Sequence, residues 1–213
     1  MAAKGSRRYT LSDTDLVAVG SHGISRSYPK NTIIVTEGDK TDSLYVILEG
    51  RVKVFVSDEG GNQVLLQTQG AGEYFGELVL DEGPRSASIM TLEPSRFLVV
   101  PKADFHDFVV RNPAFAQSLI EKLIGRVRSL TASVKSLALM DVYGRVARLL
   151  LELAEDKGGQ LTIAQRLTQQ DIASRIGASR EMVSRILKDL STGGYLTQSR
   201  TGIVLHRKPP EHW

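Results

Sequence analysis

The residues best suited to chemistry in this chain form a polar stripe near its carboxyl end. Glu181, Ser184, Arg185 and Lys188 recur at helical spacing, and Arg180 lies beside them. An arginine in the first turn of a helix can donate to O6 and N7 of guanine, and a glutamate there can accept from N4 of cytosine. The stripe therefore predicts a surface that reads base edges in a DNA major groove. The alternative is an ordinary charged helix face in water.

A second candidate is the segment GEYFGELVLDEGPRSA. Its Gly76-Glu77-Leu78 sequence suits a tight turn entering one turn of helix, whose free N–H groups could meet an anion. Arg85 and Ser86 then supply a guanidinium and a hydroxyl that suit a phosphodiester, while Glu77 could accept from a ribose hydroxyl. A buried Glu77–Arg85 ion pair that only pins the loop is the alternative, and spacing does not separate the two.

The polar stripe needs a helix and a core to position it. Ser179 is a candidate helix cap, and an apolar stripe follows it at the same spacing on the opposite face: Val183, Ile186, Leu187 and Leu190. A short helix over Gln169–Ile176 and a turn at Gly177-Ala178 precede it, with Ile172 and Ile176 directed inward. A hairpin over Leu196–Leu205, turning at Thr201-Gly202, follows it. This order predicts a winged helix-turn-helix.

The amino-terminal half has the pattern of a small antiparallel sandwich or barrel, because short β-rich runs alternate with Gly-containing turns. The expected strands are Thr32–Thr36, Ser43–Leu48, Val52–Val56, Gln63–Gln69, Ala87–Thr91 and Ser95–Val100. Adjacent glycines in Asp58–Asn62 indicate a hairpin turn. A short helix is expected before the strands, from about Ser12 with Asp15 in its first turn.

A long helix is expected to join the two halves, beginning at Asn112-Pro113. Its apolar residues form a heptad seam of Ile120, Leu123, Val127, Leu130, Val134 and Leu137. Such a seam favours a partner helix, most simply in a parallel homodimer. An amphipathic helix packed on its own domain is the alternative, because Leu119 and Ile124 widen the apolar face. Val142–Leu153 is expected to be the first helix of the DNA-binding domain.

Composition narrows the function classes. The 213 residues suffice for two domains, and the absence of cysteine excludes disulfides, thiolate catalysis and iron–sulfur ligation. No His pairs with another at metal-ligand spacing among His22, His106, His206 and His212, so no metal-based gas or redox sensor is expected. A β-roll enzyme would need clustered His and Glu on adjacent strands, and since the sequence has none, no catalysis is expected. No signal peptide or membrane span is evident, which predicts a cytoplasmic protein. The net charge of +3 falls entirely within residues 141–213.

Together, GEYFGELVLDEGPRSA and LTQQDIASRIGASREMVSRILKDL are similar to the phosphate-binding cassette and the winged helix-turn-helix of the cyclic-AMP receptor protein and fumarate–nitrate regulator (CRP/FNR) superfamily. The resemblance covers nearly the whole chain and implies an α+β fold. It places a cyclic-nucleotide-binding β-roll, a double-stranded β-helix or jelly roll, in residues 1–111. A dimerisation helix in 112–139 and a winged helix-turn-helix in 140–213 would follow.

The resemblance implies a dimeric bacterial transcription regulator whose effector repositions the DNA-reading helices, with RNA polymerase as a further partner. The matching cassette positions are Gly76, Glu77, Arg85 and Ser86, and Arg126 matches an arginine that supports the glutamate. Arg180, Glu181 and Arg185 match a base-reading triplet for palindromes of TGTGA-like half-sites. Thr168, Gln170, Ser179 and Lys188 match phosphate-contact positions, and Arg200 lies in the wing.

Three departures bear on the effector and the partners. Leu130-Thr131 stands where the cyclic-AMP receptor has a Thr-Ser pair facing the purine, and leucine cannot hydrogen bond with adenine. The interval from Glu77 to Arg85 is slightly short. Cyclic AMP is the favoured effector, with cyclic di-GMP as the alternative and a constitutive DNA-binding protein with a vestigial pocket as a third. A loop used against RNA polymerase is shortened to Asp156–Gly159.

Overall fold

The computed structural model describes Leu11 and residues 23–40, 42–81, 83–199 and 201–210. The helix expected near Ser12, His22 and His212 lie outside the described residues. Contacts divide the chain into two compact units. Of the described residues, those from Leu11 to Val56 and from Leu65 to Val127 form one unit, and those from Ser57 to Val64 and from Arg128 onward form the other.

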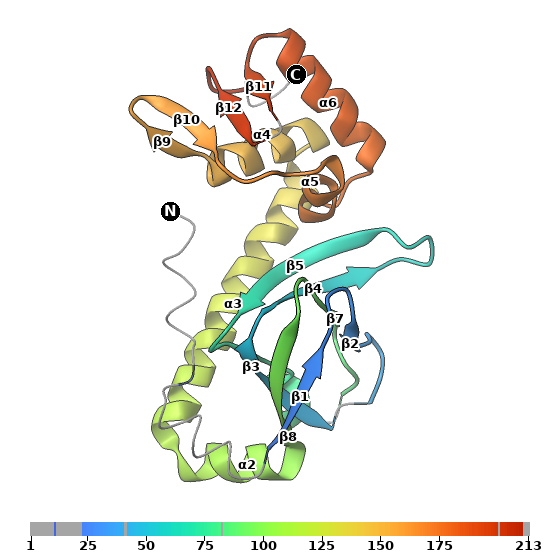
Figure 1. The fold of residues 1–213 in the computed structure, drawn as a ribbon, viewed down its shortest axis with the longest axis vertical. Coiled ribbons are helices and arrows are strands. Elements are labelled where there is room, and N and C mark those ends of the chain that lie inside the picture. The colour runs from blue at the N-terminus through green and yellow to red at the C-terminus, as the bar shows by residue number, and fades with distance from the viewer. Residues whose placement is uncertain (1–10, 12–22, 41, 82, 200, 211–213) are drawn as a thin grey trace. The chain divides into compact units, whose positions relative to one another are not determined.

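The β-rich unit is built on two four-stranded sheets (Figure 1). The strand order is β1-β8-β3-β6 in the first sheet and β2-β7-β4-β5 in the second. The strands are β1 (Ile24–Tyr28), β2 (Ile33–Val35), β3 (Ser43–Glu49), β4 (Arg51–Ser57), β5 (Gln63–Gly70), β6 (Tyr74–Phe75), β7 (Ser88–Thr91) and β8 (Ser95–Pro101). The six expected strands are present. The exposed edge strand β1 and the two-residue β6 were not expected, because neither has an apolar alternation.

The first sheet is covered on both faces. Successive residues of a strand point to opposite faces, so β3 directs Leu44 and Val46 to one face and Ile47 to the other. On the Ile47 side, Phe75 and Phe97 pack between the two sheets with ring centroids 5.7 Å apart. The β-roll core therefore lies between the sheets.

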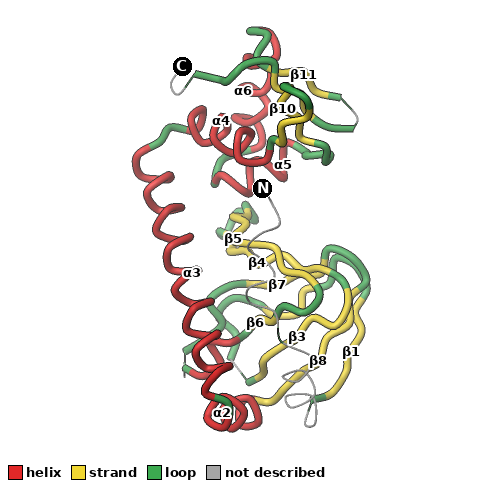
Figure 2. Tube along the Cα trace, turned by 90° about the vertical axis from the view of Figure 1, so that its left-hand side faces the viewer, coloured by secondary structure: helices red, strands yellow, loops and turns green. Residues whose placement is uncertain are grey.

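Two helices cover the other face of this sheet. Helix α2 spans Lys102–Arg111, and α3 spans Pro113–Leu139 as one uninterrupted helix (Figure 2). Phe105, Phe115 and Leu119 are buried there. The expected start of α3 at the proline is confirmed, whereas α2 was not expected. Because Leu119 packs on its own unit, it does not belong to the heptad seam.

Beyond Leu119, α3 exposes most of its apolar residues. Leu123 is half-buried, and the other seam residues are exposed: Ile120, Val127, Leu130, Val134 and Leu137. Val127 and Val134 are 62% and 64% exposed, far more than a core position. Among the described helices, none combines the length and the apolar character needed to cross a bilayer.

The second unit combines three helices with a four-stranded sheet. Its helices are α4 (Val142–Leu153), α5 (Gln169–Ile176) and α6 (Arg180–Thr192), all at the expected positions. Its strands are β9 (Glu155–Lys157), β10 (Gln160–Ile163), β11 (Leu196–Gln198) and β12 (Ile203–Leu205), in the order β11-β12-β10-β9. One core joins the helices to the sheet.

The sheet of this unit is larger than the expected two-stranded wing. The segment Asp156–Gly159, expected as a shortened loop, belongs to a β9–β10 hairpin. Gly158 and Gly159 turn it, with φ of 67° and 88°, a region that glycine adopts without steric cost. The sequence did not predict β9, because its three residues are charged and show no alternation of apolar and polar side chains.

Gly61 and Asn31 both have a left-handed backbone at a turn or loop. The turn expected at Asp58–Asn62 is present between β4 and β5, and of its two adjacent glycines only Gly61 has a positive φ, of 79°. The Asp58 carboxylate accepts from the Asn62 main-chain N–H at 2.8 Å and closes the turn. Asn31 has a φ of 62°, a left-handed backbone that asparagine adopts more readily than most residues.

Candidate functional site

The cassette begins at Gly76, between β6 and the short 3-10 helix η2 (Glu77–Leu80). Gly76 has a φ of 82°, and a Cβ there would lie 2.7 Å from Nη1 of Arg85 and 3.0 Å from the Ser43 carbonyl oxygen. Only glycine fits both constraints. The expected tight turn into one turn of helix is therefore present.

A cavity opens beside this turn. Six of the eight expected ligand-binding residues line it: Gly76, Glu77, Leu78, Arg85, Ser86 and Arg126. Apolar residues from both sheets complete the lining: Val35, Val54, Phe75, Ala87 and Ile89. Leu130 and Thr131 are not part of it. They follow Arg126 by about one turn of α3, and both are exposed.

Arg85 is buried, and strand β3 rather than Glu77 positions it. Its Nη2 donates to the Ser43 carbonyl at 2.8 Å and lies 3.7 Å from Oδ1 of the exposed Asp42. Its Cζ lies 5.8 Å from the centre of the Tyr45 ring. Burial raises the pKa of the Tyr45 hydroxyl, although the Arg85 charge opposes that shift. The guanidinium is thus fixed before any ligand arrives.

Glu77 is only 4% exposed, and its carboxylate faces α3. Nη1 of Arg126 lies 3.5 Å from its Oε1, and Nζ of Lys122 lies 3.7 Å from its Oε2. The contact expected between Arg126 and Glu77 is present. The loop-pinning ion pair weighed for Glu77 and Arg85 is not what the geometry shows, since both partners of the carboxylate come from α3.

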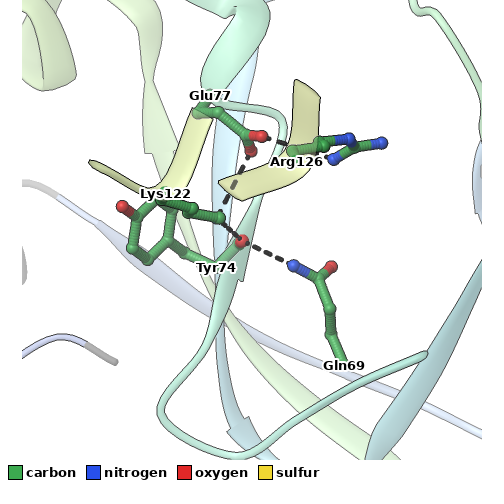
Figure 3. A network of polar contacts seen from close by, with 5 residues as sticks. All are labelled: Gln69, Tyr74, Glu77, Lys122 and Arg126. Atoms are coloured by element: carbon green, nitrogen blue, oxygen red, sulfur yellow. Dashed lines mark hydrogen bonds and ion pairs between the residues drawn. The ribbon is translucent and has the colours of Figure 1, made fainter. Parts of the chain in front are cut away.

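Lys122 is a residue of this site that the sequence patterns did not single out. Its Nζ donates to the Tyr74 carbonyl at 2.6 Å and lies 3.5 Å from the centre of the Tyr74 ring (Figure 3). Nε2 of Gln69 donates to the same carbonyl at 3.0 Å. Burial lowers the pKa of Lys122, and the Glu77 charge opposes that shift. The sequence does contain an indication of this role, because Leu119, Lys122 and Arg126 follow one another at helical spacing on one face of the helix.

The second group of candidates lies on α5 and α6. The Thr168 hydroxyl and the Asp171 carboxylate form a capping box at the start of α5, and Gly177 ends that helix with a φ of 63°. Ser179 caps α6, accepting from the Met182 N–H at 3.2 Å. These caps account for the tight turn between the helices.

Helix α6 has two faces, as expected. Its apolar stripe is buried: Val183, Ile186, Leu187 and Leu190. Arg180, Glu181, Arg185 and Lys188 are exposed, and Ser184 is half-buried. The structure thus presents the base-reading candidates together on one exposed face.

The remaining candidates are distributed around this face. Thr168 is exposed, but its hydroxyl serves the α5 cap. Gln170 is exposed on the first turn of α5, with its Nε2 3.4 Å from the Ser174 hydroxyl. Arg200 lies outside the described residues. Within the described part of the chain, no cluster of three or more His, Asp or Glu side chains could hold a metal ion.

Comparisons with known proteins agree with this geometry. Residues 25–112 match the family model of the cyclic nucleotide-binding domain, and residues 144–209 match that of the Crp-like helix-turn-helix domain. The chain is 33% identical over 183 residues to a CRP-like cAMP-activated global transcriptional regulator of Mycobacterium tuberculosis, covering 84% of this chain and 82% of that relative. It is 32% identical over 195 residues to the cAMP-activated global transcriptional regulator CRP of Pasteurella multocida, covering 87% and 91%.

One solved structure reproduces the fold closely. The c-di-GMP responsive global regulator CLP of Xanthomonas campestris matches with a TM-score of 0.80 and 23% sequence identity. The match covers 92% of this chain and 100% of that chain. At 23% identity, this match shows only that the two chains share a fold.

Proposed function

The chain belongs to the CRP/FNR superfamily of transcription regulators, with a cyclic nucleotide-binding domain followed by a Crp-like helix-turn-helix domain, and from this premise we propose that it binds palindromic promoter DNA as a homodimer in response to a cyclic nucleotide. The membership confirms the resemblance carried by the two sequence motifs. The observation that carries the proposal is α6, which buries one face and exposes Arg180, Glu181 and Arg185 on the other. The proposed function is not catalytic.

The DNA contact is assigned to the first turns of α6. Arg180 and Glu181 occupy the first turn beyond the Ser179 cap, where a recognition helix meets base edges. Arg185 follows on the same exposed face. We assign these three residues to TGTGA-like half-sites. The proposed contacts outside the bases come from Thr168, Gln170, Ser179, Ser184, Lys188 and the wing residue Arg200.

The homodimer is assigned to the seam of α3. Its alternating positions hold β-branched residues at one site and leucine at the other, the pairing that favours parallel two-stranded coiled coils. The first set is Ile120, Val127 and Val134, and the second is Leu123, Leu130 and Leu137. Exposure of most of this seam in the single chain supports a second copy as its partner. We place the dimerisation helix in residues 112–139, between an effector domain over 1–111 and a DNA-binding domain over 140–213.

The effector is assigned to the cassette cavity. The cavity is lined by two guanidinium groups, Arg85 and Arg126, and by one carboxylate, Glu77, so its charged lining favours an anionic ligand. Arg85 and Ser86 suit the phosphodiester, and Glu77 suits a ribose hydroxyl. We favour cyclic AMP, because the two relatives described above are cAMP-activated regulators.

Cyclic di-GMP is the second candidate effector. A neighbour with the same fold is named as c-di-GMP responsive. In this chain Leu130 cannot hydrogen bond with adenine, and α3 carries both Arg126 and Arg128, whose charges suit a second phosphate. A constitutive regulator whose pocket no longer controls DNA binding is the third possibility. We assign contact with RNA polymerase to the exposed β9–β10 hairpin.

One experiment tests the function and separates these effectors. The chain is titrated onto a TGTGA-type palindrome and onto a scrambled duplex, with no nucleotide, cyclic AMP, cyclic GMP or cyclic di-GMP. A shift of the palindrome that one nucleotide strengthens supports the proposal and names the effector. Equal affinity for the palindrome in every arm supports the constitutive alternative. Equal affinity for palindrome and scrambled duplex contradicts the assigned base-reading surface.

A further inference from the structure

Lys122 is a buried lysine, and lysine side chains are seldom buried in proteins. The residue is 7% exposed, although it lies in the middle of a helix whose next turns face solvent. Three groups surround its Nζ: the Tyr74 carbonyl at 2.6 Å, the Tyr74 ring at 3.5 Å and Oε2 of Glu77 at 3.7 Å (Figure 3). Removing a lysine from water is unfavourable unless such partners compensate.

These contacts tie α3 to the cassette turn. Tyr74 is the residue of β6 that precedes Phe75 and Gly76, and Glu77 opens η2. Lys122 therefore holds both ends of the turn that carries the expected hydroxyl acceptor. Arg126, one helical turn later, contacts the other oxygen of the same carboxylate.

The Glu77 carboxylate has unused hydrogen-bonding capacity. Among the described residues, no donor lies within hydrogen-bond distance of its buried Oε2, since Lys122 approaches only to ion-pair distance. A buried acceptor without a donor is costly. A ligand hydroxyl that donates to this carboxylate would remove that cost, provided that the carboxylate is held in position.

We propose that Lys122 is a positioning residue of the effector site, which holds the Glu77 carboxylate for a hydroxyl of the bound nucleotide. The inference rests on the proposed function, and it assigns the role to a residue outside the cassette motif. With Arg126 it clamps both carboxylate oxygens from α3, so hydroxyl recognition depends on a residue of the helix as well as on the cassette. Losing Lys122 leaves the carboxylate held at one oxygen only.

The test compares cyclic AMP with its 2′-deoxy analogue on the full-length chain by calorimetry. The wild type is expected to bind the 2′-deoxy analogue about tenfold or more weakly, the range for a hydrogen bond to a charged group. Lys122→Met keeps the side-chain length without the charge, and its discrimination is expected to fall to about threefold or less. Lys135→Met removes an exposed lysine of the same helix and should leave the ratio unchanged.

Lys122→Arg separates the charge from simple packing. It keeps a donor for the Tyr74 carbonyl, so it should retain more discrimination than Lys122→Met does. Because the ratio compares two ligands on one variant, a general loss of stability cancels. Equal loss of discrimination in the Arg and Met variants overturns the inference, since it would make packing the cause.

The remaining outcomes separate this inference from the function on which it rests. If the wild type binds cyclic AMP but not more tightly than the 2′-deoxy analogue, or if Lys122→Met keeps the wild-type ratio, the positioning role is wrong and the effector assignment stands. If the wild type binds neither compound, nor cyclic GMP or cyclic di-GMP, the effector assignment fails and the inference fails with it.

Discussion

The guanidinium of Arg85 lies where a side chain at Gly76 would begin. A Cβ at residue 76 would be 2.7 Å from Nη1 of Arg85, and the backbone there has a φ of 82°. Arg85 also lines the cavity, and a methyl group at residue 76 would require its guanidinium to shift. The backbone conformation at Gly76 and the proposed contact of Arg85 with a phosphate therefore depend on each other.

Gly76→Ala is expected to weaken both folding and nucleotide binding. The left-handed backbone should cost about 1–3 kcal/mol in the free energy of unfolding, and the added methyl should displace Arg85. Gly61→Ala is the matched control, because Gly61 has a φ of 79° and open space where a Cβ would be added. Denaturation and calorimetry with the effector measure the two effects. Equal nucleotide affinity in both variants would contradict the proposed contact.

Arg180→Ala and Lys188→Ala should separate sequence reading from phosphate binding. Loss of Arg180 is expected to cost about 1–3 kcal/mol at one base pair and to relax the preference there. Loss of Lys188 should weaken all duplexes alike and reduce the salt slope by about one. Anisotropy titrations on matched and scrambled duplexes across a salt series measure both. The assignment of Arg180 is wrong if its loss affects both duplexes by the same factor.

Charged residues in the exposed seam should separate the proposed dimer. Leu130→Glu with Val134→Glu places two carboxylates per chain where a parallel partner would bring equal charges together. Sedimentation should show monomers, and cooperative binding to two half-sites should disappear. Lys135→Glu changes charge on the same exposed stretch but outside the seam, so it should remain dimeric. An unaffected dimer in the double variant would place the interface elsewhere.

The stability of the β-rich unit should depend on Lys122 in alkaline solution. Burial lowers its pKa from the usual 10.5, while Glu77 and Glu73 oppose and Arg126 assists that shift. Between the lowered pKa and 10.5 the unfolded chain binds more protons at this residue than the folded chain does. Lys122 therefore contributes a free energy of unfolding that increases with pH across that window.

Chemical denaturation from neutral pH to about 10.5 checks this sign, using the usual lysine pKa as the upper limit. The difference in stability between the wild type and Lys122→Met should shift in favour of the wild type as pH rises. Tyrosines that titrate in the same range cancel in that difference. Lys135→Met should follow the wild-type curve. Parallel curves for the wild type and Lys122→Met would rule out the proton linkage.

The sequence alone determined the elements whose signals are local. The two stripes of α6 and its Ser179 cap depend on residues within a few positions of one another, and a helix period translates that spacing directly into faces. The seam of α3 followed for the same reason. The strand β9 was not predicted, because its three charged residues lack the apolar alternation that identifies a strand. Helix α2 was not predicted either, although Phe105, Phe108 and Val109 follow one another at helical spacing.

Only the tertiary structure decided the partners of the cassette side chains. Glu77 meets Arg126 across 49 residues of sequence, and Arg85 meets the Ser43 carbonyl across 42. The resemblance suggested the contact between Glu77 and Arg126. No local sequence pattern shows which helix packs against a loop or which of its side chains become buried. Lys122 shows the difference most clearly: by composition it is an ordinary helix lysine, and it became part of the site because the packing of α3 against β6 removed it from water.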